Sequence, residues 1–581
     1  MLYHLLALNI CLFSLSLFAQ DILVQAERIP KLRDRSTQNV TQLSREDFLS
    51  LSGRSLSKKF EFLPGFYSST SGGLSGTSTL FYRGLGRGHT QFLFEGFKLK
   101  DSSDIDSNFQ FQHLGDSLYG AGEILRGGSN HLAGSEAMAG IVSLESSQDN
   151  FTGISLGSNS TLKAYGNLYQ DWSSETLTVS MEALDSKGES VFNHKRVKNA
   201  QADGTQKFNG HLIYKKFLSD SFFSLLYKKT QSQYEIDSGF PLTDTVLDDH
   251  ESFAHNLLGL KYEKEINSKT MIKFKSSKQS SERNSTGDEF SSDDYEMSSE
   301  LLYLDPVHSF SIYLEGIDSK AFVSENFKKS RTQGALAGDY FFKGEKLFSE
   351  LNIRGDFYEK HKDALTYQLA LGWGSPNYLI KVSHKRGFKA PTLYQLYSKY
   401  GKTDLSPTQM ITHELTSKFF IGQMSFEQTI FYLKTFDGID FDSSENRYQN
   451  VRERLVTGSE SALVWKKNGK LVNISYTYQL PRESNDLLSR VPKKIAKFRF
   501  QKKYFKWILS LSGQYIGSRF DRGRMPSFTT FNTVLSKTHN TPKRTYRASL
   551  NIKNILDKDY ERVRRYGGTS RTFEIKGEMT F

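Results

Sequence analysis

The sequence predicts an all-β membrane barrel that is preceded by a small α+β domain. Three observations carry this prediction: an export leader, alternation of apolar and polar residues over most of the chain, and no later apolar run long enough for a membrane helix. In a bilayer, only helices and closed barrels satisfy every backbone polar group internally. An exported chain of 581 residues with alternating strands therefore indicates a barrel.

The leader, residues 1–20, is MLYHLLALNICLFSLSLFAQ. Its apolar run, residues 5–18, ends just before the small residue Ala19, which is typical of a cleaved secretory signal peptide. The run is shorter than the ~20 residues that span a bilayer, which argues against a retained anchor. Because the only cysteine, Cys11, lies in the leader, we expect neither disulfides nor thiol chemistry in the mature protein.

The composition favours strands. The chain has 44 Phe, 29 Tyr and 44 Gly but only 11 Pro, and 37% hydrophobic residues is low for a helical membrane protein. The formal charge of +12 is spread along the chain instead of forming a basic tail. We interpret it as a polar lumen rich in Lys and Arg, with some attraction for an anionic ligand, and not as a nucleic-acid site.

From about Asn150 onward, short segments alternate between apolar and polar residues, as in residues 507–515 and 271–275. The last strand, RTFEIKGEMTF, is the clearest. One face carries Phe573, Ile575, Gly577, Met579 and Phe581, and the other carries Thr572, Glu574, Lys576, Glu578 and Thr580. A chain that ends in this way resembles outer-membrane β-barrels, whose terminal aromatic residue is read by the barrel assembly machinery. We expect that role for Phe581; the alternative is a soluble sandwich that ends in Phe by chance.

The segment from Asp21 to about Ser147 has a different sequence pattern. It contains Gly-rich turns, SGGLSG and RGLGRG, and Ser44 with Asp47 predicts a capping box at the start of a short helix. A second helix is expected from Ser55 towards Phe62. We interpret this segment as a small α+β domain.

Motifs along both regions resemble one family. In the first domain they are LPGF, FYRG, FLFEGF, GEILRGG and LAGSEAMAGIVSL, and in the second they are FKAPTLYQLYSKYG, DLSP, YQN and NILDKDY. In this order and spacing they resemble TonB-dependent outer-membrane transporters. The resemblance covers nearly the whole mature chain, although Glu95 and Ala133 stand where the family usually has Asp and Tyr.

The resemblance implies a transmembrane barrel with the α+β domain as a plug inside its lumen. The expected boundaries are a signal peptide at 1–20, a TonB-box segment at 21–30, a plug at 31–147 and a barrel at 148–581. The barrel segment, about 435 residues, is long enough for about 22 antiparallel strands with moderate loops.

DILVQA, which follows the leader, resembles the TonB box. Its residues are Asp21, Ile22, Leu23, Val24, Gln25 and Ala26. The expected partner is TonB, with its inner-membrane energising complex, which captures the box by strand addition. The alternative is an ordinary disordered terminus.

The resemblance also assigns roles within the plug. Arg83 and Arg126 match the family's arginines that pair with barrel carboxylates and hold the plug. The plug apices are expected to bind the ligand, through Ser71, Gly72, Gly73, Ser103, Asp104, Asp106 and Asn108.

The substrate is the open question. DILVQAER, SDIDSNFQFQHL and KAPTLYQLYSKYG together are most similar to the cobalamin transporter branch, so a corrinoid is the leading expectation and a ferric siderophore the alternative. That branch orders its loops with calcium, and the candidate ligands here are Glu235, Asp237 and Asp244. A solvated acidic loop, or one that binds lipopolysaccharide through divalent ions, is the other interpretation. No further cofactor is expected.

Other functions are less favoured. Haem receptors place a His between boxes like FKAP and DLSP, whereas here His384 and His413 flank the pair, and we expect no haem Soret shift. A passive or adhesive barrel would need neither plug nor box. No HExxH motif, nucleophile elbow or acid–base pair suggests an enzyme.

We expect a monomer in the bacterial outer membrane that contacts lipid and lipopolysaccharide.

Overall fold

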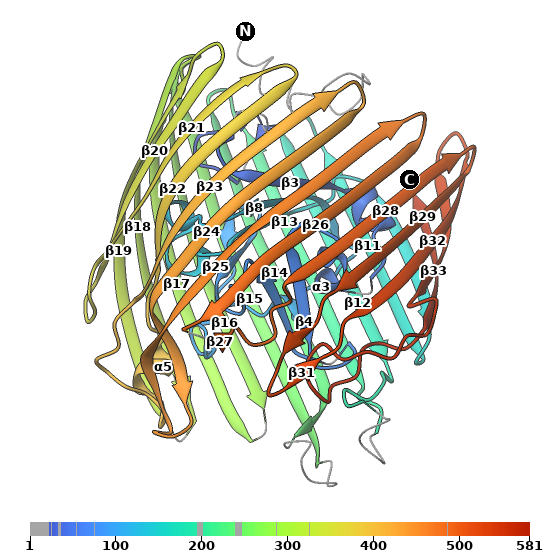
Figure 1. Cartoon of the computed structure of the whole chain (residues 1–581). Coiled ribbons are helices and arrows are strands. Elements are labelled where there is room, and N and C mark those ends of the chain that lie inside the picture. The colour runs from blue at the N-terminus through green and yellow to red at the C-terminus, as the bar shows by residue number, and fades with distance from the viewer. Residues whose placement is uncertain are drawn as a thin grey trace.

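The computed structural model is a closed antiparallel β-barrel that surrounds a smaller mixed domain (Figure 1). The described residues are 23–24, 26–32, 36–53, 55–74, 76–193, 201–238, 247–285, 287–324, 326–484 and 486–581. No helix among them is long and apolar enough to cross a membrane.

The barrel is closed by 22 long strands in chain order, and the last strand pairs with the first, which confirms the predicted fold class. The strands are β10 (Phe151–Gly157), β11 (Thr161–Asp171), β12 (Glu175–Ser186), β13 (Thr205–Phe217), β14 (Ser221–Ser238), β15 (Leu247–Asn267), β16 (Thr270–Ser285), β17 (Asp288–Tyr303), β18 (His308–Val323), β19 (Phe327–Lys343), β20 (Leu347–Tyr358), β21 (Ala364–Ser375), β22 (Tyr378–Lys389), β23 (Thr408–Ile421), β24 (Met424–Asp442), β25 (Arg447–Lys467), β26 (Lys470–Glu483), β28 (Lys494–Tyr504), β29 (Trp507–Ile516), β32 (Phe528–Asn540), β33 (Thr545–Lys553) and β34 (Thr572–Thr580). A two-residue strand, β27 (Asp486–Leu487), pairs with the end of β26.

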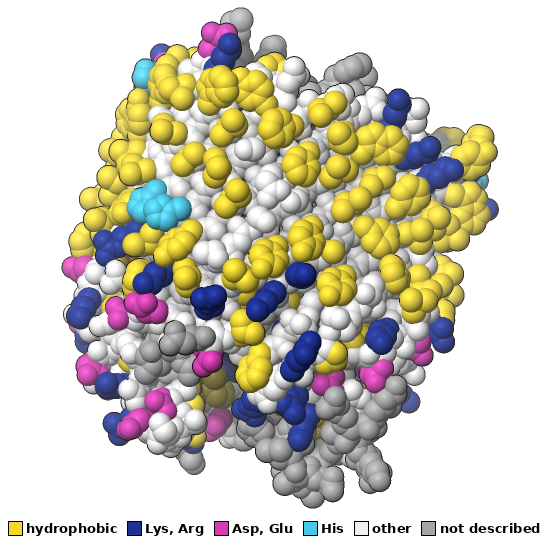
Figure 2. Space-filling model, viewed as in Figure 1, with side chains coloured by type: hydrophobic (Ala, Val, Ile, Leu, Met, Phe, Trp, Pro, Cys, Tyr) yellow, Lys and Arg dark blue, Asp and Glu magenta, His cyan; other side chains and the backbone are white. Residues whose placement is uncertain are grey.

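The alternation predicted from the sequence sorts side chains between the two faces of the barrel wall. In β34, Phe573 and Ile575 are exposed on the outside, whereas Glu574 and Glu578 are buried on the lumen side. The same holds around the barrel, and Figure 2 shows the result as a broad band of apolar side chains on the outer surface. Outward apolar and inward polar residues are the pattern of a membrane barrel.

The two ends of the barrel differ. One end has short turns and holds the C-terminus, and the other has longer connections (Figure 1). The loop between β22 and β23 contains α5 (Leu393–Tyr397), which begins with a capping box between Thr392 and Gln395. The connection between β29 and β32 forms a small hairpin from β30 (Arg519–Phe520) and β31 (Arg524–Met525).

The inner domain is built on a five-stranded sheet in the order β3 (Asn39–Ser44), β8 (Tyr119–Arg126), β9 (Gly140–Ser146), β6 (Thr90–Phe94) and β7 (Phe97–Lys98). A separate hairpin pairs β4 (Phe66–Thr70) with β5 (Ser78–Tyr82). Short helical turns complete it: α4 (Asn130–Ala133), η3 (Phe111–His113) and η4 (Ser135–Ala137). The apolar core of this domain continues onto the inner wall of the barrel, because Phe94 and Val142 share a cluster with Ile213, Leu257 and Phe431.

The two helices expected from the sequence are present. Helix α2 (Arg45–Ser50) begins with the predicted capping box between Ser44 and Asp47. Helix α3 (Leu56–Phe60) follows Ser55 as predicted but ends before Phe62. After Phe60 the chain continues in tighter turns, in which Phe62 donates to the Lys59 carbonyl and Leu63 to the Phe60 carbonyl, and Pro64 disfavours further helix at Leu63.

Candidate functional site

A tight turn after β5 presents Arg83 to the barrel wall. Arg83 and Gly84 both have positive φ, 49° and 79°, and Tyr82 and Leu85 bridge across them. This is the geometry of a two-residue hairpin turn with φ positive at both central positions. It directs the guanidinium group from the plug towards the inner face of the barrel wall, and Arg83 is 1% exposed there.

Arg83 and Arg126 meet three glutamates from three neighbouring barrel strands. Arg83 donates to both carboxylate oxygens of Glu460, from Nε at 3.0 Å and Nη2 at 3.3 Å, and its Nη1 lies 2.9 Å from Glu414. Arg126 donates to Glu427 at 3.0 Å. We call these five residues the arginine cluster. They join the plug to β23, β24 and β25.

The charges in the arginine cluster compensate one another. Burial alone lowers the pKa of Arg83, but Glu414 and Glu460 outweigh it and hold that pKa well above its usual value. The Tyr82 hydroxyl donates to Glu460 at 3.1 Å, and the Phe431 ring lies 4.3 Å from the guanidinium carbon. Arg83 is therefore charged at any physiological pH and is bound on several sides.

The predicted TonB-box segment lies only partly within the described residues. Asp21, Ile22 and Gln25 are outside them. Leu23–Val24 forms β1, which pairs with β2 (Lys31–Leu32), and the backbone N–H of Ala26 donates to Glu123 of the plug at 2.7 Å. The backbone just after the box therefore turns back on itself and is tied to the plug.

Residues 26–32 and 36–39, which we call the strap, run from this hairpin along the barrel wall. Arg28 pairs with Asp339 of β19 at 2.8 Å, and Lys31 pairs with Glu350 of β20 at 2.6 Å. Further along, Gln38 donates to Gln368 of β21 at 2.6 Å.

Two more contacts complete the strap. Asn39 donates to Glu414 of β23 at 3.2 Å, and Ile29 packs in an apolar site with Phe341 and Phe348. The polar contacts of the strap therefore advance from one barrel strand to the next in chain order.

The apical segment, Ser103–Asn108, folds around a buried carboxylate at the long-loop end of the plug. Asp104 is 0% exposed and pairs with Arg87 of the plug and with Arg283 of β16, the latter at 3.1 Å. Burial raises the pKa of Asp104, but the two guanidinium groups outweigh it and lower the pKa to about 2. Asp104 is thus a charged structural group that joins the apex to the barrel.

The other predicted ligand-binding residues of the apices also have internal contacts. Ser103 donates to Asp101 at 2.6 Å, Asn108 donates to the Thr90 carbonyl at 3.0 Å, and Asp106 pairs with Arg87 at 3.1 Å. In the neighbouring apex, Ser71 donates to the Thr77 carbonyl at 3.5 Å. Gly72 and Gly73 lie against Val191 and Glu189 of the loop after β12.

Comparison with known families identifies the architecture. The TonB-dependent receptor plug domain model matches residues 33–141, and the TonB-dependent receptor-like beta-barrel model matches residues 142–555. The chain belongs to the TonB-dependent receptor family. It therefore lies in the outer membrane and serves TonB-dependent transport.

Solved receptors share this fold at low identity. The siderophore receptor PirA from Acinetobacter baumannii has a TM-score of 0.80 at 13% identity, over 93% of this chain and 98% of its own. The ferric citrate transporter FecA also gives 0.80 at 13%, over 94% and 98%. The ferric yersiniabactin uptake receptor FyuA from Yersinia pestis gives 0.74 at 15%, again over 94% and 98%. Identities this low show the fold alone.

In this family of barrels the short turns face the periplasm and the longer loops face outward. An aromatic group that sequence reasoning missed lies at the outer end of the receptor: Phe290, Phe327, Tyr394, Tyr397 and Tyr448, which we call the apical aromatic cluster. It packs against Ile105 of the apical segment. No sequence signal indicated it, because its members come from four separate strands and loops.

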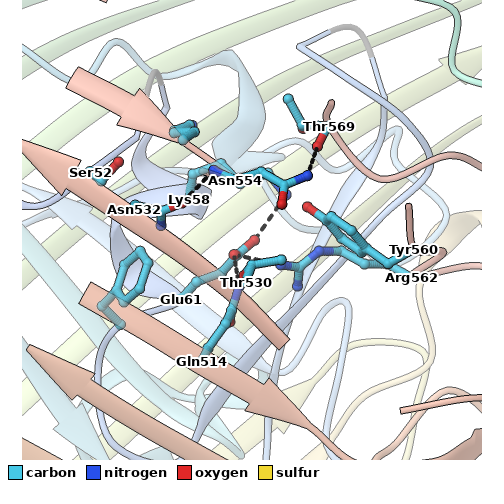
Figure 3. A pocket seen from close by; sticks show the side chains of 12 residues that line it. Ser52, Lys58, Glu61, Gln514, Thr530, Asn532, Asn554, Tyr560, Arg562 and Thr569 are labelled. Carbon is cyan, nitrogen blue, oxygen red and sulfur yellow. Dashed lines mark hydrogen bonds and ion pairs between the residues drawn. The ribbon is translucent and has the colours of Figure 1, made fainter. Parts of the chain in front are cut away.

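The receptor also has a polar cleft between the plug and the barrel at β29, β32 and β33 (Figure 3). Arg562 and Lys58 both donate to Glu61 there, at 2.8 Å and 2.9 Å. Burial lowers the pKa of Lys58 to about 8, and Arg562 acts in the same direction. The cleft is lined by groups that already pair with one another, and we assign no ligand to it.

The predicted calcium ligands are only partly described. Glu235 accepts from the backbone N–H of Gly204 at 2.7 Å. The side chain of Asp237 and all of Asp244 lie outside the described residues, within which no group of three or more metal-binding side chains occurs. Calcium binding stays a prediction.

The last residue, Phe581, follows the strand that closes the barrel. Its backbone N–H donates to Asn150 at 3.0 Å, and its side chain is 47% exposed at the periplasmic edge. The side chain is thus accessible, and its recognition by the assembly machinery stays a prediction.

Proposed function

We propose that this receptor captures an anionic ferric siderophore at its outer end and imports it with energy supplied through TonB. The observation that carries the proposal is the combination of cations and half-buried aromatic rings around the plug apex. Lys329 lies over the Tyr397 ring at 5.3 Å, and Arg283, which also pairs with Asp104, lies over the Phe290 ring at 4.2 Å. Aromatic faces beside cations suit a flat, oxygen-rich, negatively charged chelate.

The outer loops add positive charge to this surface. The connection after β29 carries Arg522 and Arg524 at the surface, and the connection after β33 carries Arg564, Arg565 and Arg571. Clustered positive charge raises the local concentration of an anionic ligand. The names of PirA, FecA and FyuA as iron receptors point in the same direction.

Contacts between the outer loops and the plug can transmit a movement caused by ligand binding to the plug. Thr392, at the start of α5, donates to the Ile105 carbonyl of the apical segment at 2.8 Å. A ligand that moves α5 therefore also pulls on the plug apex. On the periplasmic side we propose that TonB captures Asp21 to Ala26 and peels the strap from the wall.

A corrinoid is the second candidate, because the motifs around the box and the apical segment resemble the cobalamin branch. Titrating purified receptor with a ferric catecholate, ferric citrate and cyanocobalamin, in calcium and in EDTA, separates the two. We expect quenching of intrinsic fluorescence by a ferric chelate in both conditions. Binding of cyanocobalamin alone, in either condition, would reject the siderophore and favour the corrinoid.

The aromatic cluster is tested in the same titration. Tyr394→Ala removes a ring that contacts the apex, and we expect the Kd for the ferric chelate to rise at least about tenfold, or about 1.4 kcal/mol. Tyr546→Ala, on the outer surface of the barrel, is the matched control and should leave the Kd unchanged. If both substitutions changed the Kd equally, the ligand would not bind at the apical aromatic cluster.

Energy coupling is tested by deleting residues 21–26. The box precedes the plug and barrel domains and is proposed to serve coupling, so we expect normal folding and ligand binding but no accumulation of ligand in cells. Unchanged uptake in the deletion strain would contradict TonB-driven transport through this segment.

A further inference from the structure

Two histidines face each other on the outer surface of the barrel. His384 of β22 and His413 of β23 are directly paired in the strand register. Their neighbours Lys385 and Thr412 are buried on the lumen side, so both imidazoles point outward. Histidine side chains are visible on this outer surface in Figure 2.

The two rings present nitrogens to each other at a specific distance. Nδ1 of His384 and Nδ1 of His413 are 3.2 Å apart, and the ring centroids are 4.5 Å apart. A metal ion bonds to imidazole nitrogen at about 2.0–2.1 Å, which separates two ligand nitrogens by about 2.9 Å at a right angle and about 3.4 Å at a tetrahedral angle. The observed separation lies between these values.

The second ring nitrogen of His384, Nε2, has a hydrogen-bond partner of the kind that metal-binding histidines usually have. Its Nε2 lies 3.1 Å from the Tyr367 hydroxyl oxygen. Histidines that bind metals usually donate their second N–H to an oxygen, which fixes the ring and leaves the first nitrogen unprotonated. With Nε2–H donating to Tyr367, Nδ1 of His384 is free to bind a metal together with His413.

The position of the pair makes it accessible to ions. On its periplasmic side the next outward residues are Val382 and Leu415, which are 53% and 42% exposed in the apolar band. On its outer side they are Arg386 and Ile411, and Arg386 also donates to Gln409, two residues closer to the outer end of β23, at 2.9 Å. The pair therefore lies near the outer edge of the apolar band, where the first polar outward side chains, Arg386 and Gln409, follow it.

We propose that His384 and His413 form a two-histidine site for a divalent transition-metal ion of the Cu²⁺, Ni²⁺ and Zn²⁺ group. Imidazole nitrogen suits these ions, and Cu²⁺ binds most tightly in the general order of affinities. Two protein ligands leave the other coordination positions to water. The site is separate from ligand import, because both side chains lie outside the lumen.

A bound ion would tie together the two strands that carry the α5 loop. β22 ends at Lys389 and β23 begins at Thr408, and the loop between them contacts the apical segment through Thr392. The metal would thus brace the base of a loop that the proposed import mechanism moves.

The test is titration of purified receptor, stripped with EDTA, with Cu²⁺ alone, followed by calorimetry and electron paramagnetic resonance. We expect one tight Cu²⁺ with two imidazole nitrogens. His384→Asn and His413→Asn should each raise the Kd at least about tenfold and leave at most one coordinated nitrogen. Tyr367→Phe should weaken binding less, since it removes only the partner of Nε2.

The matched control is His308→Asn. His308 is also exposed and lies beside a tyrosine, Tyr340, at 2.7 Å, but in the described structure no second histidine faces it. This substitution should leave the tight Cu²⁺ unchanged. The proposal is overturned if wild-type receptor binds Cu²⁺ no more tightly than the His384→Asn/His413→Asn double variant, with heat-modifiability showing both barrels folded.

Discussion

The arginine cluster and the strap both join the plug to the barrel wall with buried charges, but they arrange those charges differently. In the cluster, the single side chain of Arg83 binds Glu414 and Glu460 at once. In the strap, the wall contacts are spread over successive strands, as Arg28 contacts β19, Lys31 contacts β20 and Gln38 contacts β21.

This difference in arrangement determines how the two regions respond to a pulling force. Contacts in series break one at a time, so peeling the strap requires only the free energy of one contact at each step, about 1–3 kcal/mol. In the cluster, the contacts to Glu414 and Glu460 converge on the one guanidinium group of Arg83, so these contacts must be lost together. We infer that pulling from the periplasm first releases the strap, and that the arginine cluster sets the resistance of the remaining plug.

The largest effect is expected for Arg83→Ala. It leaves two buried carboxylates, Glu414 and Glu460, without their main partner, and breaking a buried pair in this way costs about 3–5 kcal/mol. We expect faster hydrogen exchange in β4 and β5 and a leak current through the barrel in planar bilayers. In the Arg83→Met/Glu460→Gln double variant the loss should be smaller than the sum of the single losses. Additive losses would contradict a coupled cluster.

A smaller, local effect is expected for Arg28→Ala. Asp339 keeps hydrogen bonds from Ser311 and Asn352, at 2.9 Å and 2.6 Å, so the cost is about 1–3 kcal/mol. Because the chain has only one cysteine, in the leader, Val24→Cys can report box exposure by maleimide labelling. Labelling should speed up at least about tenfold, with Arg28→Lys as the control. If Arg83→Ala exposed the box more than Arg28→Ala did, the proposed order of release would be wrong.

For the arginine cluster, the sequence predicted the two plug arginines but not the barrel glutamates that bind them. Resemblance to the family named Arg83 and Arg126, but not their partners, which lie about 300 or more residues away. The three glutamates lie close together because the register of β23, β24 and β25 places them at the same height on the inner face of the barrel. Such a register is set by turns and bulges over the whole barrel, which no local pattern contains.

The apical segment illustrates the same limit. Asp104 is predicted to contact the ligand, which stays a prediction, and the structure shows contacts that the sequence did not indicate, with Arg87 and Arg283. Arg283 belongs to β16, and nothing in its local sequence indicates that its side chain reaches the plug apex. The alternation of β34 and the capping box at Ser44, in contrast, depend on neighbouring residues only, and both were predicted correctly.

A second group of three glutamates sharpens the comparison, because it lacks an arginine. Glu145, near the end of β9, lies beside Glu95 and Glu123, and burial together with these two carboxylates outweighs Lys215 and Lys261 and raises its pKa to about 7. Its ordinary value is 4.5, so the folded plug takes up a proton between these two pH values. The free energy of unfolding should therefore fall as pH rises from about 4.5 to 7, by at most about 3 kcal/mol.

Glu145→Gln should remove this part of the pH dependence. We expect the variant to match wild-type plug stability at pH 5 and to exceed it at pH 8, as measured by hydrogen exchange of β8 and β9. A constant difference between the two proteins across this range would show that Glu145 does not titrate there.

The smallest effect is expected for an exposed pair between the same two domains. Arg547 of β33 lies 2.7 Å from Glu46 of α2, but the two side chains are 18% and 44% exposed. Exposed pairs contribute about 0–1 kcal/mol because water and salt screen them. Arg547→Ala is a cleaner test than Glu46→Ala, since Glu46 also stabilises the N-terminus of α2. Hydrogen exchange of the plug should change less than about fivefold. A loss close to that of Arg83→Ala would mean that the number of ion pairs, and not their burial and convergence, holds the plug in place.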